Sequence, residues 1–558
     1  MEQARPTRAR ANPVTPSSVP PGTGRPAAVQ HCDAVVVGAG PNGLVAAIAL
    51  ADAGWDVVLV EAADEVGGAV RSAEVTRPGF VTDLFSAFYP LAAASPVIRD
   101  LDLAAHGLTW RRSPAVLAHA LDDGRAVVVH PDPERTASEV DAFAAGDGEA
   151  WLSLVADWQR LREPLLDALF TPFPPVRSVV RALRRLHLAG AADLARLAVL
   201  PAHRLGREHF RGQGGPLLIT GNALHTDLPP LAAGSGLFGW LLAMLAQDVG
   251  FPVPAGGAGR LAAALASRAR AAGVQLRCGR AVQQVEVPGG RARGVRLEDG
   301  SVIRARRAVL AAVAAPLLYR GLLAPQTLPA RLLRDLDRFQ WDDATVKLNW
   351  ALEARVPWSA PGAALAGTVH LGADQEGLLD LGADLAAGRR PERPFVLFGQ
   401  MTTADPSRSP AGTESAWAYS HLPFALARSA PDVEAHVLAI QDAVERVAPG
   451  FTGRVLARHV QTPADLEAAN ANLVRGAVNA GTSALHQQLI FRPTVGLGRP
   501  ETVIEGLYLA GASAHPGGGV HGACGWNAAR AALGAHGRAG VVRRRLTRTA
   551  WARLLRSE

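Results

Sequence analysis

Apolar and polar positions near the N-terminal end predict a strand, a helix and a second strand. The run Ala34-Val35-Val36-Val37 is typical of a short buried strand, and the small residues from Leu44 to Ala53 are typical of a helix. Asp56 to Val60 is expected to form the second strand, which ends at Glu61. Residues 1–30 are rich in Pro, Arg, Ser and Thr and show no apolar period, so we expect a disordered tail there.

The remainder of the chain alternates between predicted helices and strands, and it contains no internal repeat. Residues 150–200 read as helical, with Arg177, Arg181 and Arg184 at helical spacing opposite apolar positions. Beyond this region the pattern predicts a helix at 261–272, strands at 274–277, 308–312, 345–351 and 394–401, a hairpin turn at 288–290, a helix at 430–447, a strand at 507–510 and a helix at 523–533.

The composition allows a large core. The chain has 558 residues, of which 48% are hydrophobic and 19% charged, so we expect two to four core-forming units. It contains no apolar run of about 18 residues, which argues against a transmembrane helix. The N-terminal segment also lacks the apolar stretch of a signal peptide, so a cytoplasmic protein is expected.

Cysteine spacing and charge exclude several classes of function. Cys32, Cys278 and Cys524 lie far apart, which argues against a disulfide framework, a redox-active dithiol or a metal site. The net charge is +7, but the arginines are scattered among alanines, so compositional bias is favoured over nucleic-acid binding. Basic amphipathic stretches at 177–196 and 543–556 are favoured as solvated faces, although they leave peripheral contact with an anionic membrane open.

A glycine-rich run joins the first strand to the first helix: Gly38-Ala39-Gly40-Pro41-Asn42-Gly43. Gly38 permits a tight turn, Gly40 lets the backbone approach a diphosphate, and Gly43 lets the helix pack on the strand. The diphosphate then lies at the positive end of the helix dipole. Glu61, at the end of the second strand, is placed to accept hydrogen bonds from ribose hydroxyls. This context predicts a dinucleotide-binding fold.

A second glycine loop follows directly, at Gly67-Gly68-Ala69-Val70-Arg71. Paired glycines can press against a diphosphate, and the Arg71 guanidinium offers forked donors to it. Enzymes that bind only NAD do not need such a loop. The loop therefore shifts the expected cofactor from NAD toward FAD.

These two motifs resemble the start of the glutathione-reductase-type flavoproteins, and more narrowly the branch with amine oxidases, phytoene desaturases and retinol saturases. The segment from Gly506 to Ala523 is very similar to the closing motif of the phytoene dehydrogenase-like, carotenoid/retinoid oxidoreductase family. The resemblance covers residues 33–533. It implies an α/β fold in which an FAD-binding Rossmann-like domain is intertwined with a substrate domain of mixed sheet and helices.

The resemblance also implies a division of the chain. The FAD-binding domain is expected at 31–100, 250–315 and 490–535, the substrate domain at 101–249 and 316–489, and a basic C-terminal tail at 536–558.

The closing motif is expected to cover the flavin. Gly511, Gly518, Gly519 and Val520 are the expected contacts, with a helix that begins at about Val520 and favours the reduced anionic flavin. His515 and His521 flank this turn, and two interpretations stay open for each. Either its ring is satisfied by the backbone, or it lines the substrate cavity and takes part in catalysis.

Two further residues are assigned from the resemblance. Val282 is expected to bond the adenine through its backbone. Lys347 is the only lysine of the sequence and is expected in mid-strand, where a lysine of the amine-oxidase pattern reaches flavin N5 through a water. An ordinary exposed strand lysine is the alternative.

The expected activity is FAD-dependent desaturation, saturation or other oxidation of an apolar, polyene or isoprenoid-like substrate by hydride transfer to or from flavin N5. The electron acceptor is left open among oxygen, a quinone and NAD(P). A flavin amine oxidase is the first alternative, although the closing segment offers only Trp526 toward an aromatic cage. A flavin-binding interaction protein without turnover is the second.

Overall fold

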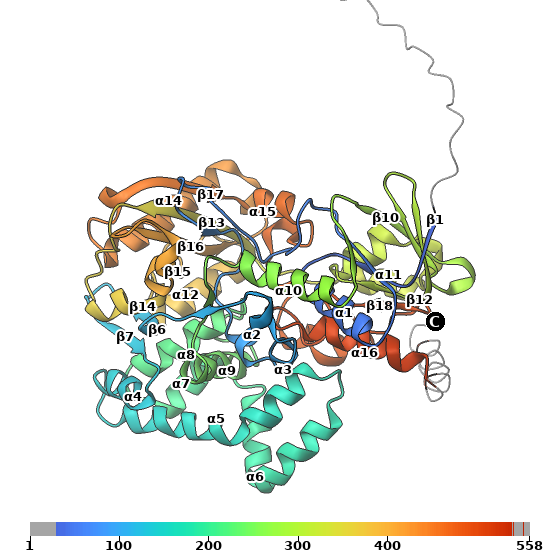
Figure 1. The fold of residues 1–558 in the computed structure, drawn as a ribbon. Helices are drawn as coiled ribbons and strands as arrows, with labels where there is room; N and C mark the ends of the chain where they lie inside the picture. The colour runs from blue at the N-terminus through green and yellow to red at the C-terminus, as the bar shows by residue number, and fades with distance from the viewer. Residues whose placement is uncertain (1–28, 538–539, 541–550, 552–558) are drawn as a thin grey trace, which may run out of the picture.

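The computed structural model describes residues 29–537, 540 and 551. The tail expected at 1–30 and the basic tail expected at 536–558 lie almost wholly outside the described residues. Two seven-stranded sheets form the two lobes of the molecule, with helices packed around both (Figure 1). The expected α/β fold with mixed sheets is confirmed. Among the described helices, none has the length and apolar character needed to cross a membrane.

The first sheet has the strand order β10-β11-β12-β1-β2-β9, with β18 paired to β12. Its parallel centre is β1 between β12 and β2, and β10 and β11 form an antiparallel hairpin at one edge. The strands are β1 (Val29–Val37), β2 (Val57–Val60), β9 (Gln275–Arg277), β10 (Val282–Glu286), β11 (Gly294–Leu297), β12 (Val302–Ala311) and β18 (Leu507–Leu509).

Three helices cover one face of this sheet (Figure 1): α1 (Pro41–Asp52), α10 (Gly259–Ala271) and α16 (Ala523–Ala535). Successive residues of β1 point to opposite faces, so Ala34 and Val36 pack under these helices. Val35 and Val37 pack on the other face, which α11 (Ala330–Asp337) helps to cover.

The second sheet has the strand order β17-β13-β16-β15-β14-β6-β7. Its strands are β6 (Ala115–Ala120), β7 (Ala126–Val129), β13 (Ala344–Leu352), β14 (Ala366–Leu371), β15 (Val396–Gln400), β16 (Glu414–Leu422) and β17 (Val455–Gln461). Val346, Leu348 and Trp350 of β13 pack under α14 (Ala430–Val447). Alternation therefore turns Thr345 and Lys347 toward the opposite face of the sheet.

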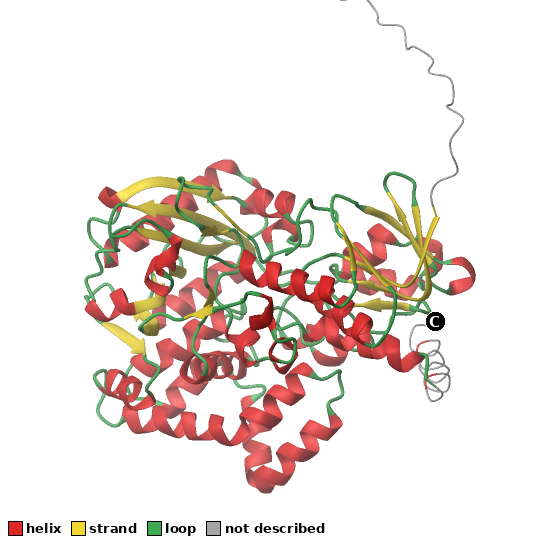
Figure 2. Cartoon of the chain, in the orientation of Figure 1, coloured by secondary structure: helices red, strands yellow, loops and turns green. Residues whose placement is uncertain are grey.

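Helices gather below this opposite face (Figure 2). They are α4 (Pro133–Asp141), α5 (Asp147–Phe170), α6 (Val176–Leu197), α7 (Ala202–His209), α8 (Gly214–Leu224) and α9 (Ser235–Asp248). The shorter elements are α2 (Pro90–Ala94), α3 (Pro96–Arg99), α12 (Gln375–Ala386), α13 (Met401–Ala404), α15 (Pro463–Ala469), β3 (Ser72–Ala73), β4 (Thr82–Asp83), β5 (Trp110–Arg111) and β8 (Val253–Pro254).

Candidate functional site

The first glycine loop connects the end of β1 to the N-terminus of α1. Gly38 has a φ of 94°, and a Cβ atom there would lie 3.1 Å from the carbonyl oxygen of Ala312. A Cβ atom at Gly43 would overlap the carbonyl oxygen of Gly38. The loop geometry therefore requires both glycines, and Pro41 opens the helix without losing a hydrogen bond.

Glu61 lies at the end of β2, against this loop. Its Oε2 accepts a hydrogen bond from the backbone N–H of Ala39 at 2.6 Å, and its Oε1 accepts one from Ala63 at 2.9 Å. These bonds hold the carboxylate beside the glycine loop. Each oxygen keeps a second lone pair that a ribose hydroxyl can use.

The second glycine loop packs directly on the first. The Gly67 N–H donates to the carbonyl of Ala39 at 2.9 Å, and a Cβ atom at Gly68 would lie 3.1 Å from the Cα of Gly40. Arg71 fastens the loop, because its Nε donates to the carbonyl of Gly68 at 3.0 Å and its Nη2 to that of Ala469 at 2.7 Å. The two predicted glycine loops therefore pack against each other and together form one continuous surface of backbone atoms.

Val282 is the first residue of β10 and follows a loop that touches the same region. In that loop, Gly279 donates to the carbonyl of Ala63 at 2.8 Å and Arg280 to that of Glu61 at 2.9 Å. The backbone that leads to Val282 therefore crosses the end of β2. Its contact with an adenine stays a prediction.

The closing segment leaves β18 and turns beside the first loop. A Cβ atom at Gly511 would lie 2.5 Å from the carbonyl oxygen of Val313, and one at Gly518 would lie 2.6 Å from Oδ1 of Asn479. The helix expected at 523–533 is confirmed, because α16 begins at Ala523 after Gly522, whose φ is 72°. The other expected start, at about Val520, is wrong and falls in the turn before the helix. The preceding turn keeps residues 517–522 non-helical.

A cavity of about 380 Å³ lies between these loops and the second sheet. Its lining is mainly apolar. Pro41, Asn42, Val70 and residues 518–520 line it from the side of the glycine loops. From the other elements come Phe85, Phe88, Tyr89, Leu169, His225, Phe238, Leu241, Leu242, Phe251, Thr345, Lys347, Thr368, Leu397, Trp417 and Tyr419, among others.

Lys347 is buried in the wall of this cavity, with 3% of its surface exposed. The alternative of an ordinary exposed strand lysine is therefore wrong. Its Nζ donates to the carbonyls of Asp83 and Phe85, the latter at 3.1 Å, and lies 5.3 Å from the ring centre of Trp417. Burial lowers the pKa of Lys347 to about 7, although Asp83 acts in the opposite direction.

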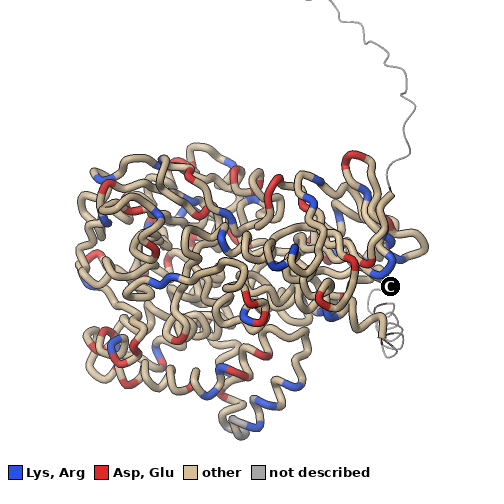
Figure 3. Tube along the Cα trace, viewed as in Figure 1, with Lys and Arg blue, Asp and Glu red and all other residues tan. Residues whose placement is uncertain are grey.

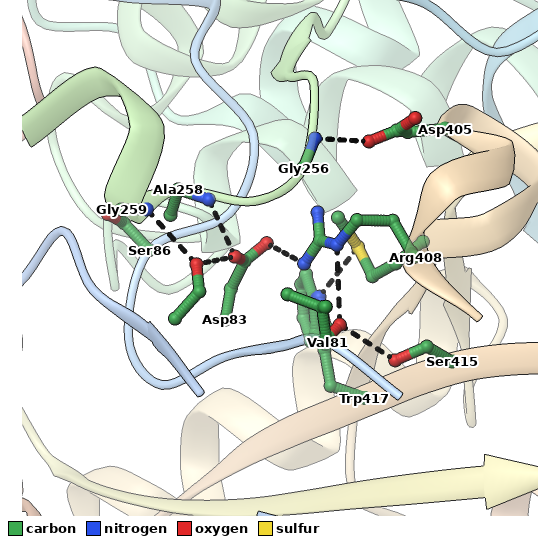
Figure 4. Close-up of polar contacts among 12 residues, drawn as sticks. Val81, Asp83, Ser86, Gly256, Ala258, Gly259, Asp405, Arg408, Ser415 and Trp417 are labelled. Atoms are coloured by element: carbon green, nitrogen blue, oxygen red, sulfur yellow. Dashed lines mark hydrogen bonds and ion pairs between the residues drawn. The ribbon is translucent and has the colours of Figure 1, made fainter. Parts of the chain in front are cut away.

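Asp83, whose backbone carbonyl binds Lys347, forms a buried ion pair with Arg408 (Figure 4). Oδ2 of Asp83 lies 2.8 Å from Nη2 of Arg408, and both side chains are fully buried. The other oxygen of Asp83 accepts from the hydroxyl of Ser72 at 2.6 Å and from the N–H of Ala258 at 2.8 Å. The positive charge of the Arg408 guanidinium also lowers the pKa of Lys347.

The structure separates the two histidines of the closing motif. His521 lines the cavity and is also satisfied by the backbone, since its Nδ1 accepts from the N–H of Ala523 at 3.0 Å. His515 is buried against Phe173, with ring centres 6.3 Å apart, and is absent from the cavity wall described above. Burial lowers the pKa of both to about 4, so both rings are neutral.

The aromatic residues of the site come from segments that the sequence analysis did not single out. Trp526 packs under the first sheet and does not line the cavity. Trp417 and Tyr419 of β16 do line it, stacked at 5.9 Å, and Phe88 lies 6.0 Å from Trp417. Their alternating positions in a buried strand could have indicated this face.

Comparison with known proteins identifies the family. A family model described as "Flavin containing amine oxidoreductase" matches residues 42–533. The chain belongs to this family. As such it is an FAD-dependent oxidoreductase, and the expected resemblance to phytoene dehydrogenase-like enzymes is confirmed by the relatives described next.

Relatives in this family have several names. The chain is 30% identical over 544 residues to mouse pyridine nucleotide-disulfide oxidoreductase domain-containing protein 2, covering 89% of this chain and 92% of the mouse protein. It is 26% identical to the zeta-carotene-forming phytoene desaturase of Myxococcus xanthus, covering 87% and 90%. Putrescine oxidase bound to putrescine shares the fold, with a TM-score of 0.59, 18% identity and coverage of 91% and 99%.

The residues present fit an FAD. The Gly40–Gly68 contact leaves bare backbone where a Cβ atom would fill the space, and the N-terminus of α1 opens at the same point. Oδ1 of Asn42 is buried without a protein partner and lines the cavity. A diphosphate at the two loops and a flavin ring extending into the cavity would use these groups.

Proposed function

We propose that this protein is an FAD-dependent oxidoreductase that desaturates, saturates or otherwise oxidises an apolar, isoprenoid-like substrate. The observation that carries the proposal is the mainly apolar cavity that joins the glycine loops to the second sheet. Bound FAD supplies a hydride acceptor or donor at N5. Apolar walls exclude water from the reacting carbon and hold it against the ring.

Among the described residues that line the cavity, Lys347 is the side chain whose pKa lies near neutral. His521 is neutral and occupied by the backbone, and Lys347 has a pKa of about 7, so its amine holds or releases a proton near neutral pH. Hydride transfer from an unactivated carbon suits such a site, because the cofactor carries the chemistry. The phytoene desaturase relative supports this class of substrate.

A flavin amine oxidase is the second candidate. Lys347 beside the stacked rings of Trp417 and Tyr419 supports it, since aromatic faces can hold an amine. The putrescine oxidase comparison supports the fold alone.

The deciding experiment is anaerobic bleaching of the bound flavin by polyenes, amines and NAD(P)H in turn. Bleaching by a polyene supports the proposal, and bleaching by an amine alone replaces it with the amine oxidase. Bleaching by NAD(P)H assigns the direction of saturation. A flavin that stays oxidised with every donor supports an interaction protein without turnover, and protein purified without flavin contradicts the FAD assignment.

We also propose peripheral contact with a membrane through α6. Its first turns expose Val176, Val179, Val180 and Leu183, with exposed fractions between 40% and 61%. Arg181 is paired with Asp167 of α5 at 2.6 Å, which reduces the free positive charge. Acidic and basic residues are interspersed elsewhere on the tube (Figure 3), so the apolar stripe rather than net charge supports this contact.

A further inference from the structure

Two histidines meet at the wall of the cavity. His225 follows the C-terminal end of α8 and lines the cavity, and His370 lies in β14 behind it. Their Nε2 atoms are 2.6 Å apart. His119 of β6 stands edge-on to His370, with ring centres 5.9 Å apart, and its Nε2 bonds the carbonyl of Ala373 at 2.9 Å.

All three rings are neutral. Burial lowers the pKa of His225 to about 3 and that of His119 to about 4, and it lowers the pKa of His370 with help from its two histidine neighbours. In a neutral pair, the Nε2–H of one ring donates to the Nε2 lone pair of the other. His225 therefore keeps one ring nitrogen, Nδ1, outside this contact. That nitrogen is a donor or an acceptor according to which ring holds the shared proton.

A second polar group without a partner lies in the same wall. Thr368 is two residues before His370 in β14, so both side chains point to the same face of the sheet. It lines the cavity, it is 1% exposed, and its Oγ1 has no hydrogen-bond partner. A buried hydroxyl without a partner lowers stability, and a bound ligand that pairs with it removes that cost.

Apolar side chains line the cavity beside His225. The ring of Phe251 lies 5.8 Å from that of His225, and Leu242 and Leu397 line the cavity with them. Polar groups without partners in such a wall favour a ligand that carries a matching polar group, because an apolar ligand leaves them unpaired.

We infer that His225 and Thr368 bind one oxygen function, a hydroxyl or a carbonyl, of an otherwise apolar substrate. His370 is a positioning residue: its Nε2 shares a hydrogen bond with Nε2 of His225 and so fixes the orientation of the His225 ring. The two neutral tautomers of the histidine pair let His225 present an N–H donor to a carbonyl or a lone pair to a hydroxyl. This inference rests on the proposed oxidoreductase function and names its substrate class as oxygenated isoprenoids.

The test is binding of two ligands to the FAD-loaded protein under anaerobic conditions. Geranylgeraniol is compared with the hydrocarbon in which its hydroxyl is replaced by hydrogen, and binding is followed by the shift of the flavin absorbance spectrum and by the fluorescence of the protein. The quantity of interest is the ratio of the hydrocarbon dissociation constant to that of the alcohol. Because the two ligands share the same hydrocarbon chain, a change in apolar contacts affects both dissociation constants equally. The ratio therefore reports the contribution of the hydroxyl to binding.

Substituting His225→Phe or Thr368→Val is expected to lower this ratio about tenfold, with hydrocarbon affinity nearly unchanged. His225→Gln, which keeps a donor and an acceptor, is expected to restore part of the ratio. Thr345→Val is the matched control, since Thr345 also lines the cavity with an unpartnered Oγ1 but lies on β13, away from His370.

Three outcomes overturn the inference. If the ratio stays within twofold of the wild-type value in both His225→Phe and Thr368→Val, the inference is wrong but the proposed function is unaffected. The same holds if the ratio falls in Thr345→Val instead. Failure of wild-type protein to bind either ligand overturns both the inference and the apolar-substrate proposal. Because the first comparison uses wild-type protein and each variant removes one group, misfolding of one variant leaves the other to decide.

Discussion

Lys347 should titrate near neutral pH although an ordinary lysine does so near 10.5. Its side chain is 3% exposed, and its Nζ contacts two backbone carbonyls and the face of Trp417 but no carboxylate directly. The carboxylate of Asp83 is already paired with Arg408. Burial without a dedicated counter-ion lowers the pKa to about 7.

The free-energy consequence has a definite sign. Each tenfold change in a proton-binding constant corresponds to about 1.4 kcal/mol, so lowering this pKa from 10.5 to about 7 makes the protonated native state less stable by about 5 kcal/mol. Between pH 7 and 10.5 the unfolded chain binds a proton that the native chain lacks. Stability attributable to this group therefore rises with pH across that window, and the full cost is present below pH 7.

A single-residue titration can measure this directly, because Lys347 is the only lysine of the sequence. Protein labelled with ¹³Cε-lysine, carried on a tag without lysine, gives one Cε resonance. We expect its chemical shift to change with a midpoint near 7 in the FAD-loaded protein and near 10.5 in urea. A midpoint above about 9 in the folded protein would refute the burial argument.

Matched variants separate the charge from the packing. Lys347→Met keeps the length of the side chain and should remove this contribution to the pH dependence of stability between pH 7 and 10.5. Thr345→Val, on the same face of β13, should leave that dependence as in wild type. An unchanged pH dependence in Lys347→Met would contradict the assignment of the proton to this amine.

Three further predictions follow from the described contacts. Gly40→Ala should fold but purify with little flavin, because its Cβ atom fills the space beside Gly68 without a backbone clash; flavin absorbance measures this, and Gly453→Ala, in open space, should retain the cofactor. Arg408→Met should lower the melting temperature by roughly 3–4 °C, since it leaves a buried carboxylate unpaired at a cost of about 3–5 kcal/mol, and an unchanged value would exclude that cost. Leu183→Asp should weaken binding to anionic lipid vesicles severalfold in a sedimentation assay, whereas Asp at the equally exposed Leu438 should not.

The parts of the fold that the sequence predicted are those coded by short-range patterns. The glycine spacing from Gly38 to Gly43 fixes a strand, a turn and a helix within a few residues, and the structure has β1 and α1 there. The strand at 345–351 and the helix at 430–447 follow from apolar periodicity, and β13 and α14 match them. The helix expected at 523–533 matches α16, whereas the start expected at about Val520 falls in the glycine turn before it.

The site beyond the glycine loops was harder to predict because long-range pairing builds it. His225 and His370 are 145 residues apart, and their contact depends on α8 packing near β14. A single polar residue in an apolar strand pattern is a local signal that could have suggested them, as in the β14 run Ala-Gly-Thr-Val-His-Leu. That signal marks a buried polar group but does not identify its partner.

Long-range contacts also connect the Lys347 amine to the Asp83–Arg408 ion pair. Asp83 accepts from Lys347 through its backbone carbonyl and from Arg408 through its side chain, and it also receives the N–H of Ala258 at the start of α10. It thereby links the second sheet to a helix of the first. A displacement of Asp83 would move the carbonyl that binds Lys347 and would also change the charge near the lysine amine. The stability of the contact between the second sheet and α10 is therefore coupled to the proton affinity of Lys347 through Asp83.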